Sequence, residues 1–274
     1  LPQLLWVRRH DPKAWEQVRR IMITKDYVRS RLTGDWVTDR IDALSTLFFD
    51  ARAVRWSEEL CSYIDLPMEW LPPVVNPTDV VGEVTPMAAE ETGLAPGTPV
   101  VAGTSDSAAE DFGAGAVRPG QCIVKLATAA NLNVMTSVAR PHPKTLTYYH
   151  VVPGMWYTCT ATNSCASAHR WFRDTFCQEE IRLAQESGRN AYELMGEMAA
   201  EIPVGCEGLL FHPYLLGERS PYWDPHLRAD FVGITMRHTR AHFARAILEG
   251  IAFSIRDCRG TIDELELPID EVRI

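Results

Sequence analysis

An aspartate directly after a strand-like run is the most suggestive candidate for chemistry in this sequence. The apolar segment 98–103 predicts a short buried strand, and Thr104-Ser105-Asp106-Ser107 follow it at the start of a small-residue helix. In α/β proteins, ligands bind in the crevice at the carboxyl ends of the strands. Asp106 could therefore be a general base that takes a proton from a substrate hydroxyl. The same position favours an Asx-turn or a helix N-cap, so both interpretations stand on the local sequence.

A second candidate is the turn 127–130, Ala-Thr-Ala-Ala, between strand-like runs at 121–126 and 131–136. Small residues at such a turn let backbone N–H groups approach a phosphate, and Thr128 adds a hydroxyl. Small residues also occur at hairpin tips for steric reasons alone. The pattern is compatible with a phosphate site and with a plain tight turn.

A third candidate is the loop 217–225, which reads Gly-Glu-Arg-Ser-Pro-Tyr-Trp-Asp-Pro. We favour a structural loop anchored by Glu218 and Arg219 over a substrate-binding loop. The eight histidines show no metal-ligand spacing, so we predict no metal site, and we expect His242 to serve the first turn or the packing of the last helix. P-loop and dinucleotide-binding glycine motifs are absent from the sequence.

The elements that must position these residues follow from hydrophobic spacing. Before residue 115 we predict helices at 11–32, 57–65 and 86–93, an extended proline-rich segment at 66–77 and the strand at 98–103. After it we predict an antiparallel meander, helices and one more strand, in this order: strands 121–126, 131–136, 145–152 and 155–161, helices 165–177 and 189–201, strand 208–211 and helix 240–260. We place a domain boundary near residue 115.

Composition narrows the class of protein. The 274 residues are 46% hydrophobic and 23% charged, which is enough apolar material for packed cores. The net charge of −9 argues against nucleic-acid binding, and no apolar run approaches the length of about 18 residues that a membrane span needs. The seven cysteines are scattered and form no C-x-x-C pair, so we expect reduced, mostly buried thiols in a cytoplasmic protein.

Several longer motifs together resemble the FGGY family of carbohydrate kinases, with xylulokinase-like pentulose kinases the nearest group. The segment 229–234, followed after seven residues by 242–249, fits the second signature of the family. The segment 25–34, Lys-Asp-Tyr-Val-Arg-Ser-Arg-Leu-Thr-Gly, is similar to its K-D-Y-L-x-x-x-L-T-G motif. Residues 171–174 resemble its W-[LF]-R-D helix, and 217–225 resemble its G-E-R-[ST]-P and Y-W-D-P loop.

The resemblance implies an α/β fold of the actin-like ATPase type, with two RNase H-like domains and an active site between them. It implies that Asp106 is the catalytic base, that Ser107 contacts the substrate, and that ATP with Mg²⁺ is the phosphoryl donor. It further places Thr128 and Ala127 at a phosphate-binding turn. Ala166 and Arg170 fall at nucleotide-side positions of the helix that begins near 165.

The sequence also departs from the family pattern. Alanines stand at 127 and 130 of the turn, where the family prefers glycine, and a methyl group there can obstruct the approach to phosphate. Ala166 replaces a common glycine, and Arg170 replaces a usual glutamine. The alternatives are therefore a non-catalytic actin-fold module for sugar sensing or interaction, with a degraded ATP site, and a glycerol- or gluconate-type kinase of the same family.

By this resemblance both domains are incomplete in the chain. Residues 1–115 correspond to the C-terminal half of the sugar-binding domain, and 116–274 to the N-terminal half of the nucleotide-binding domain. The first phosphate loop, D-x-G-T, and the glycine-rich adenine segment are absent, so we expect the chain alone to be inactive. The expected ligands are a sugar or polyol and ATP, and a homodimer is an open alternative to a monomer.

Overall fold

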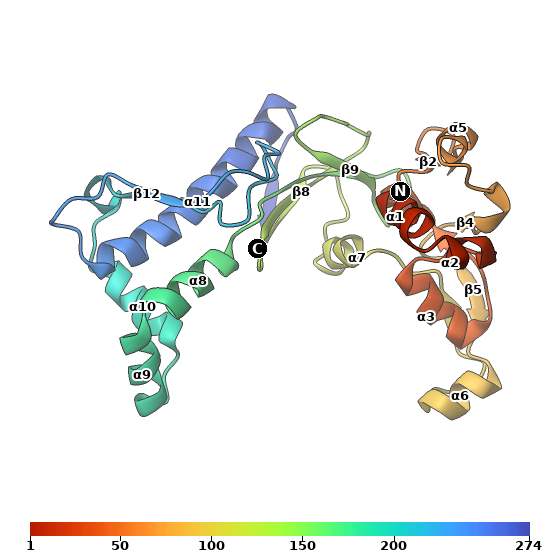
Figure 1. Ribbon diagram of the computed structural model, residues 1–274, viewed down its shortest axis with the longest axis horizontal. Helices are drawn as coiled ribbons and strands as arrows, with labels where there is room; N and C mark the ends of the chain where they lie inside the picture. The colour runs from red at the N-terminus through yellow and green to blue at the C-terminus, as the bar shows by residue number, and fades with distance from the viewer. The chain divides into compact units, whose positions relative to one another are not determined.

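The computed structural model describes residues 1–274 and divides them into two compact units. The first unit comprises Leu1–Gly115 together with Tyr148–Trp156, and the second comprises Ala116–Thr147 with Tyr157–Ile274 (Figure 1). The division falls after Gly115, and the segment 148–156 groups with the first unit. None of the helices combines the length and apolar character that a membrane span needs.

The first unit is built from short helices and two-stranded sheets. Its pairs are parallel β1–β4 and antiparallel β2–β3 and β5–β6. Its elements are α1 (Pro2–His10), α2 (Pro12–Gln17), α3 (Thr24–Thr33), β1 (Thr38–Asp39), α4 (Arg40–Ser45), β2 (Phe49–Asp50), β3 (Arg55–Trp56), α5 (Glu58–Ser62), a 3₁₀ turn (Met68–Trp70), β4 (Val74–Val75), β5 (Val80–Glu83), α6 (Pro86–Thr92), β6 (Pro99–Val101) and α7 (Asp106–Gly113).

The predicted single helix over 11–32 is wrong, because the chain is extended between α2 and α3. Asp11 caps α2 by accepting a hydrogen bond from the Ala14 N–H. The helix ends at Gln17, and Val18 is already extended. The Ile21 N–H then donates to the Trp70 carbonyl at 2.8 Å, a long-range bond that a continuous helix would not allow.

The core of the first unit gathers around α5 and the neighbouring β2–β3 pair. Buried side chains from α5 and the strands around it form the core, with tryptophans packed against them: Phe48, Cys61, Ile64, Leu66, Leu71, Trp15, Trp56 and Trp70. The strand β6 was predicted to be buried, yet Val101 is 49% exposed. The reason is that β6 pairs only with β5 in a two-stranded sheet.

A five-stranded sheet organises the second unit. Its order is β13–β7–β8–β10–β9, from β7 (Gln121–Leu126), β8 (Ala130–Thr136), β9 (Leu146–Tyr149), β10 (Trp156–Ala161) and β13 (Glu271–Arg273). β7 and β8 form the predicted antiparallel hairpin, but β8 lies beside β10 rather than β9, so the simple meander is a wrong prediction. β13 adds a parallel strand on the far side of β7.

The remaining elements of the second unit are helical apart from one small sheet. The long helix α11 (Arg240–Glu264) contacts α8 (Ala166–Phe176), α10 (Ala191–Ala200), β8 and β11 (Leu210–His212), which pairs with β12 (Asp230–Val232). The sequence missed α9 (Gln178–Ser187). His242 completes a capping box with Thr239 at the start of α11 and is buried, as expected for a first-turn residue. All seven cysteines are buried, as predicted.

Candidate active site

Asp106 is exposed on the first turn of α7, directly after the irregular segment 102–105. It is not the N-cap, a position that Ser105 occupies without a side-chain bond. One Asp106 oxygen, Oδ1, accepts the Ser107 N–H at 2.7 Å and lies 3.4 Å from the Ser107 hydroxyl. Its other oxygen has no protein partner, so it can accept a proton or hydrogen bond from a ligand.

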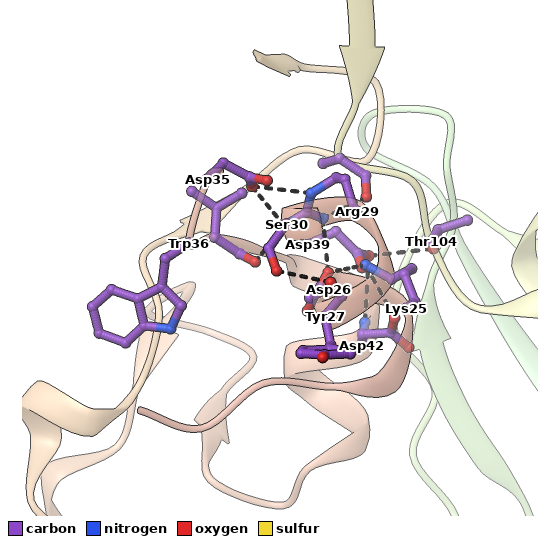
Figure 2. Close-up of polar contacts among 12 residues, drawn as sticks. Lys25, Asp26, Tyr27, Arg29, Ser30, Asp35, Trp36, Asp39, Asp42 and Thr104 are labelled. Atoms are coloured by element: carbon purple, nitrogen blue, oxygen red, sulfur yellow. Dashed lines mark hydrogen bonds and ion pairs between the residues drawn. The ribbon is translucent and has the colours of Figure 1, made fainter. Parts of the chain in front are cut away.

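The segment that carries Asp106 is held by charged residues of a different part of the chain. Arg29 of α3 donates to the Ala102 carbonyl at 2.7 Å. The Thr104 hydroxyl donates to Asp39 at 3.2 Å (Figure 2). Arg29 and Asp39 belong to a group of buried or half-buried charged residues joined by ion pairs. We call this group the α3 cluster; its members are Lys25, Asp26, Arg29, Asp35, Asp39 and Asp42.

Within the α3 cluster, Lys25 lies among three carboxylates (Figure 2). Its ammonium is 2.6 Å from Asp26, 2.8 Å from Asp39 and 3.3 Å from Asp42. Burial lowers the pKa of Lys25, but the attraction of these carboxylates outweighs it and the net shift is upward. Burial, the largest cause, and the charge of Asp39 raise the pKa of Asp42 to about 6, against the opposing attraction of Lys25.

In the second unit, the turn 127–130 is fastened by its carbonyls to the start of α8. The Ala127 carbonyl accepts the Ala166 N–H at 2.9 Å, and the Thr128 carbonyl accepts the Cys165 N–H at 2.9 Å and the Ser167 hydroxyl at 2.8 Å. Because C=O and N–H point in opposite directions across a trans peptide, the N–H groups of Thr128 and Ala129 are directed away from α8. Two neighbouring free N–H groups are a fit for an anionic oxygen.

The alanines of this turn do not strain it. None of the residues 127–130 adopts a positive φ, so the conformation does not require glycine. The structure thus brings Ala127, Thr128 and Ala166 together through backbone bonds. Ala166 and Arg170 are both exposed and stand four residues apart, which puts them on one face of α8. Asp106 and Ser107 belong to the first unit and these residues to the second.

The loop 217–225 bonds to the residues that follow β10, next to the turn 127–130. These contacts agree with the structural role favoured from the sequence. One oxygen of the buried Glu218 accepts the Asn163 N–H at 2.6 Å and the Arg219 N–H at 2.8 Å. Arg219 donates to the Thr162 carbonyl at 2.8 Å, while the Thr162 hydroxyl accepts the Ala130 N–H at 2.9 Å. Burial raises the pKa of Glu218, although its two N–H donors oppose that shift.

Sequence reasoning missed the residues that act through long-range contacts. Arg29 and Asp39 are 73 and 65 residues away from their partners Ala102 and Thr104. The only signal was the charged pattern of the segment 25–39, which does not reveal its partner. No group of three His, Cys, Asp or Glu side chains could hold a metal ion.

Comparison with known proteins gives two family matches that run along the chain. Residues 1–113 match the N-terminal domain of the FGGY family of carbohydrate kinases, and residues 127–274 match its C-terminal domain. Among curated relatives, a xylulose kinase of Lactococcus lactis is 33% identical over 265 residues, and a gluconokinase of Bacillus subtilis is 28% identical over 256 residues. These matches cover 96% and 93% of this chain but 51% and 50% of the relatives.

A solved structure shares the architecture. The crystal structure of xylulose kinase from Rhodospirillum rubrum has a TM-score of 0.84 and 32% sequence identity, covering 97% of this chain and 52% of that one. The chain therefore spans about half the length of the relatives it matches, with the mixed α/β, actin-like fold of that family. On both family matches and this likeness, the chain belongs to the FGGY family of carbohydrate kinases.

Proposed function

We propose that the protein that contains this chain transfers the γ-phosphoryl group of ATP to a hydroxyl of a pentulose such as xylulose. The observation that carries the proposal is Asp106, an exposed carboxylate with one unpartnered oxygen at the first turn of α7. Five of the most similar curated relatives bear the name xylulose kinase, which supports the choice of sugar class.

In this proposal Asp106 accepts the proton of the sugar hydroxyl. The hydroxyl oxygen then forms a bond to the γ-phosphorus as the bond from that phosphorus to the β-bridging oxygen breaks, which releases ADP. Ser107, whose hydroxyl lies 3.4 Å from Asp106 Oδ1, would orient the sugar by hydrogen bonding. Most of the rate gain in such a reaction comes from positioning and charge stabilisation, so the held geometry of the 102–105 segment matters.

On the nucleotide side, the outward N–H groups of Thr128 and Ala129 would donate to phosphate oxygens. The exposed Arg170 makes no ion pair, and it would meet the nucleotide from the same face of α8 as Ala166. Mg²⁺ would come with ATP, since it usually retains its waters and binds mainly to the phosphates, neutralising their charge. In this proposal residues 1–115 would be half of the sugar-binding domain, and residues 116–274 would be half of the nucleotide-binding domain.

The test is phosphoryl transfer by the natural, full-length protein. It should be incubated with ATP, Mg²⁺ and each of xylulose, ribulose, glycerol and gluconate, and sugar phosphate should be followed by ³¹P NMR. We expect xylulose to be the best acceptor. Preference for gluconate would favour the gluconate-type kinase, for which the gluconokinase relative is the supporting observation. No ATP binding at millimolar concentration would instead support a non-catalytic sensing module.

A further inference from the structure

The segment between β6 and α7 presents Asp106 without regular secondary structure of its own. Two of its backbone N–H groups bond to the chain just before β5. Ala102 donates to the Asp79 carbonyl and Gly103 donates to the Pro77 carbonyl, each at 2.9 Å. Gly103 adopts a φ of +73°, and the Lys25 side chain lies 3.8 Å from where a Cβ would be built. The segment is therefore packed directly against α3.

On its other side the segment is held by two members of the α3 cluster. Arg29 Nη1 donates to the Ala102 carbonyl at 2.7 Å. Asp39 Oδ1 accepts the Thr104 hydroxyl at 3.2 Å (Figure 2). These contacts lie four and two residues before Asp106. No element other than this segment connects the end of β6 to the first turn of α7.

Arg29 and Asp39 are themselves held by several other partners. Arg29 is 5% exposed, and its remaining donors reach Asp26 at 2.7 Å, Asp35 at 3.0 Å and the Val37 carbonyl at 2.6 Å. Asp39 is fully buried, accepts the Ile41 N–H at 2.9 Å and pairs with Lys25 at 2.8 Å. Buried charged groups that hold several partners at once have little freedom, so the backbone they hold is preorganised.

We propose that Arg29 and Asp39 are positioning residues for Asp106, acting through the Ala102 carbonyl and the Thr104 hydroxyl. This inference rests on the proposed role of Asp106 and deepens it. A base displaced by about 1 Å can lose about 100-fold in rate, which is why a motif distant in sequence can affect the chemistry. The alternative is that the α3 cluster only joins α3 to β6. In that case the cluster contributes to the stability of the fold and does not affect the position of Asp106.

The test uses Thr104→Val in the natural, full-length protein, because valine keeps the shape and removes only the hydroxyl. We expect kcat to fall about tenfold, with KM for ATP and for the sugar within about twofold of the parent, and Thr104→Ser to restore kcat. Amide hydrogen exchange of the peptide 102–109 should accelerate about three- to tenfold in the valine variant. Arg29→Lys, which keeps the charge, should lower kcat further if it folds.

A matched control is Thr98→Val, since the Thr98 hydroxyl bonds the Ala95 carbonyl in the same β5–β6 hairpin region and touches no part of the α3 cluster. It should change neither kcat nor exchange in 102–109. Unchanged exchange in this peptide for Thr104→Val would overturn the inference, as would a loss of kcat that serine does not restore. If Thr104→Val accelerates this exchange but the parent protein phosphorylates no sugar, the hold on the 102–105 segment is supported and the proposed function is contradicted.

Discussion

Asp42 is a carboxylate of the α3 cluster whose charged form is disfavoured in the folded chain. Burial and the neighbouring Asp39 raise its pKa to about 6, against the opposing attraction of Lys25. Asp26 also faces it with the same sign of charge. The folded state therefore binds a proton at Asp42 more tightly than the unfolded state, whose pKa is near 3.8. This contribution to stability is complete below about pH 4 and is lost as the pH rises through 6.

Replacing Asp42 with asparagine should remove that pH dependence. We expect the free energy of unfolding of Asp42→Asn, relative to the parent, to rise by about 1–3 kcal/mol between pH 4 and pH 7. Urea unfolding at pH 4, 5, 6 and 7 measures this difference. A difference that is flat over the range, or that falls, would contradict the electrostatic description of the cluster.

Arg170 offers a test of the nucleotide side at a single residue. Its side chain is exposed on the face of α8 shared with Ala166, and it has no carboxylate partner. Arg170→Gln should raise KM for ATP about three- to tenfold and leave kcat nearly unchanged, because a phosphate contact made equally in ground and transition states affects binding alone. Arg256→Gln, at another exposed arginine on α11, is the matched control and should leave KM unchanged. An Arg170→Gln variant with the parental KM for ATP would show that Arg170 does not contact the nucleotide.

At the scale of elements, close packing of α11 against β11 supports the second unit. A Cβ at Gly250 would lie 2.2 Å from the Phe211 carbonyl oxygen, whereas a Cβ at Gly260 of the same helix would meet nothing within 4 Å. Gly250→Ala should therefore lower the free energy of unfolding by about 1–3 kcal/mol or more. Gly260→Ala should raise it by about 0.4–1 kcal/mol, because alanine favours helix. Thermal unfolding of both variants compares them, and equal effects would contradict the packing account.

The elements show which features local sequence can predict. The hairpin β7–β8, the capped start of α2 and the long α11 follow from spacing and capping residues that act within one element. The extended break at 18–23 and the β8–β10 neighbourhood do not, because each depends on a partner distant in the chain. The same applies to the site, where Asp106 and Thr128 stood out locally while Arg29 and Asp39 act across more than 60 residues.

At the scale of the whole molecule, the proposed machinery is divided between the two units. Asp106 and the α3 cluster belong to the first unit, and the turn 127–130 with α8 belongs to the second. The chain spans about half the length of the relatives it matches, so phosphoryl transfer has to be measured with the natural, full-length protein.

The most direct measurement is the rate of xylulose phosphorylation by that protein and by its Asp106→Asn variant. Loss of a general base should lower kcat by about 10²–10⁴-fold, while the melting temperature stays within a few degrees because Asp106 is exposed and is not the N-cap of α7. Asp65→Asn, at an exposed carboxylate of the same unit, should keep kcat within about twofold. An Asp106→Asn variant with parental turnover would contradict the account.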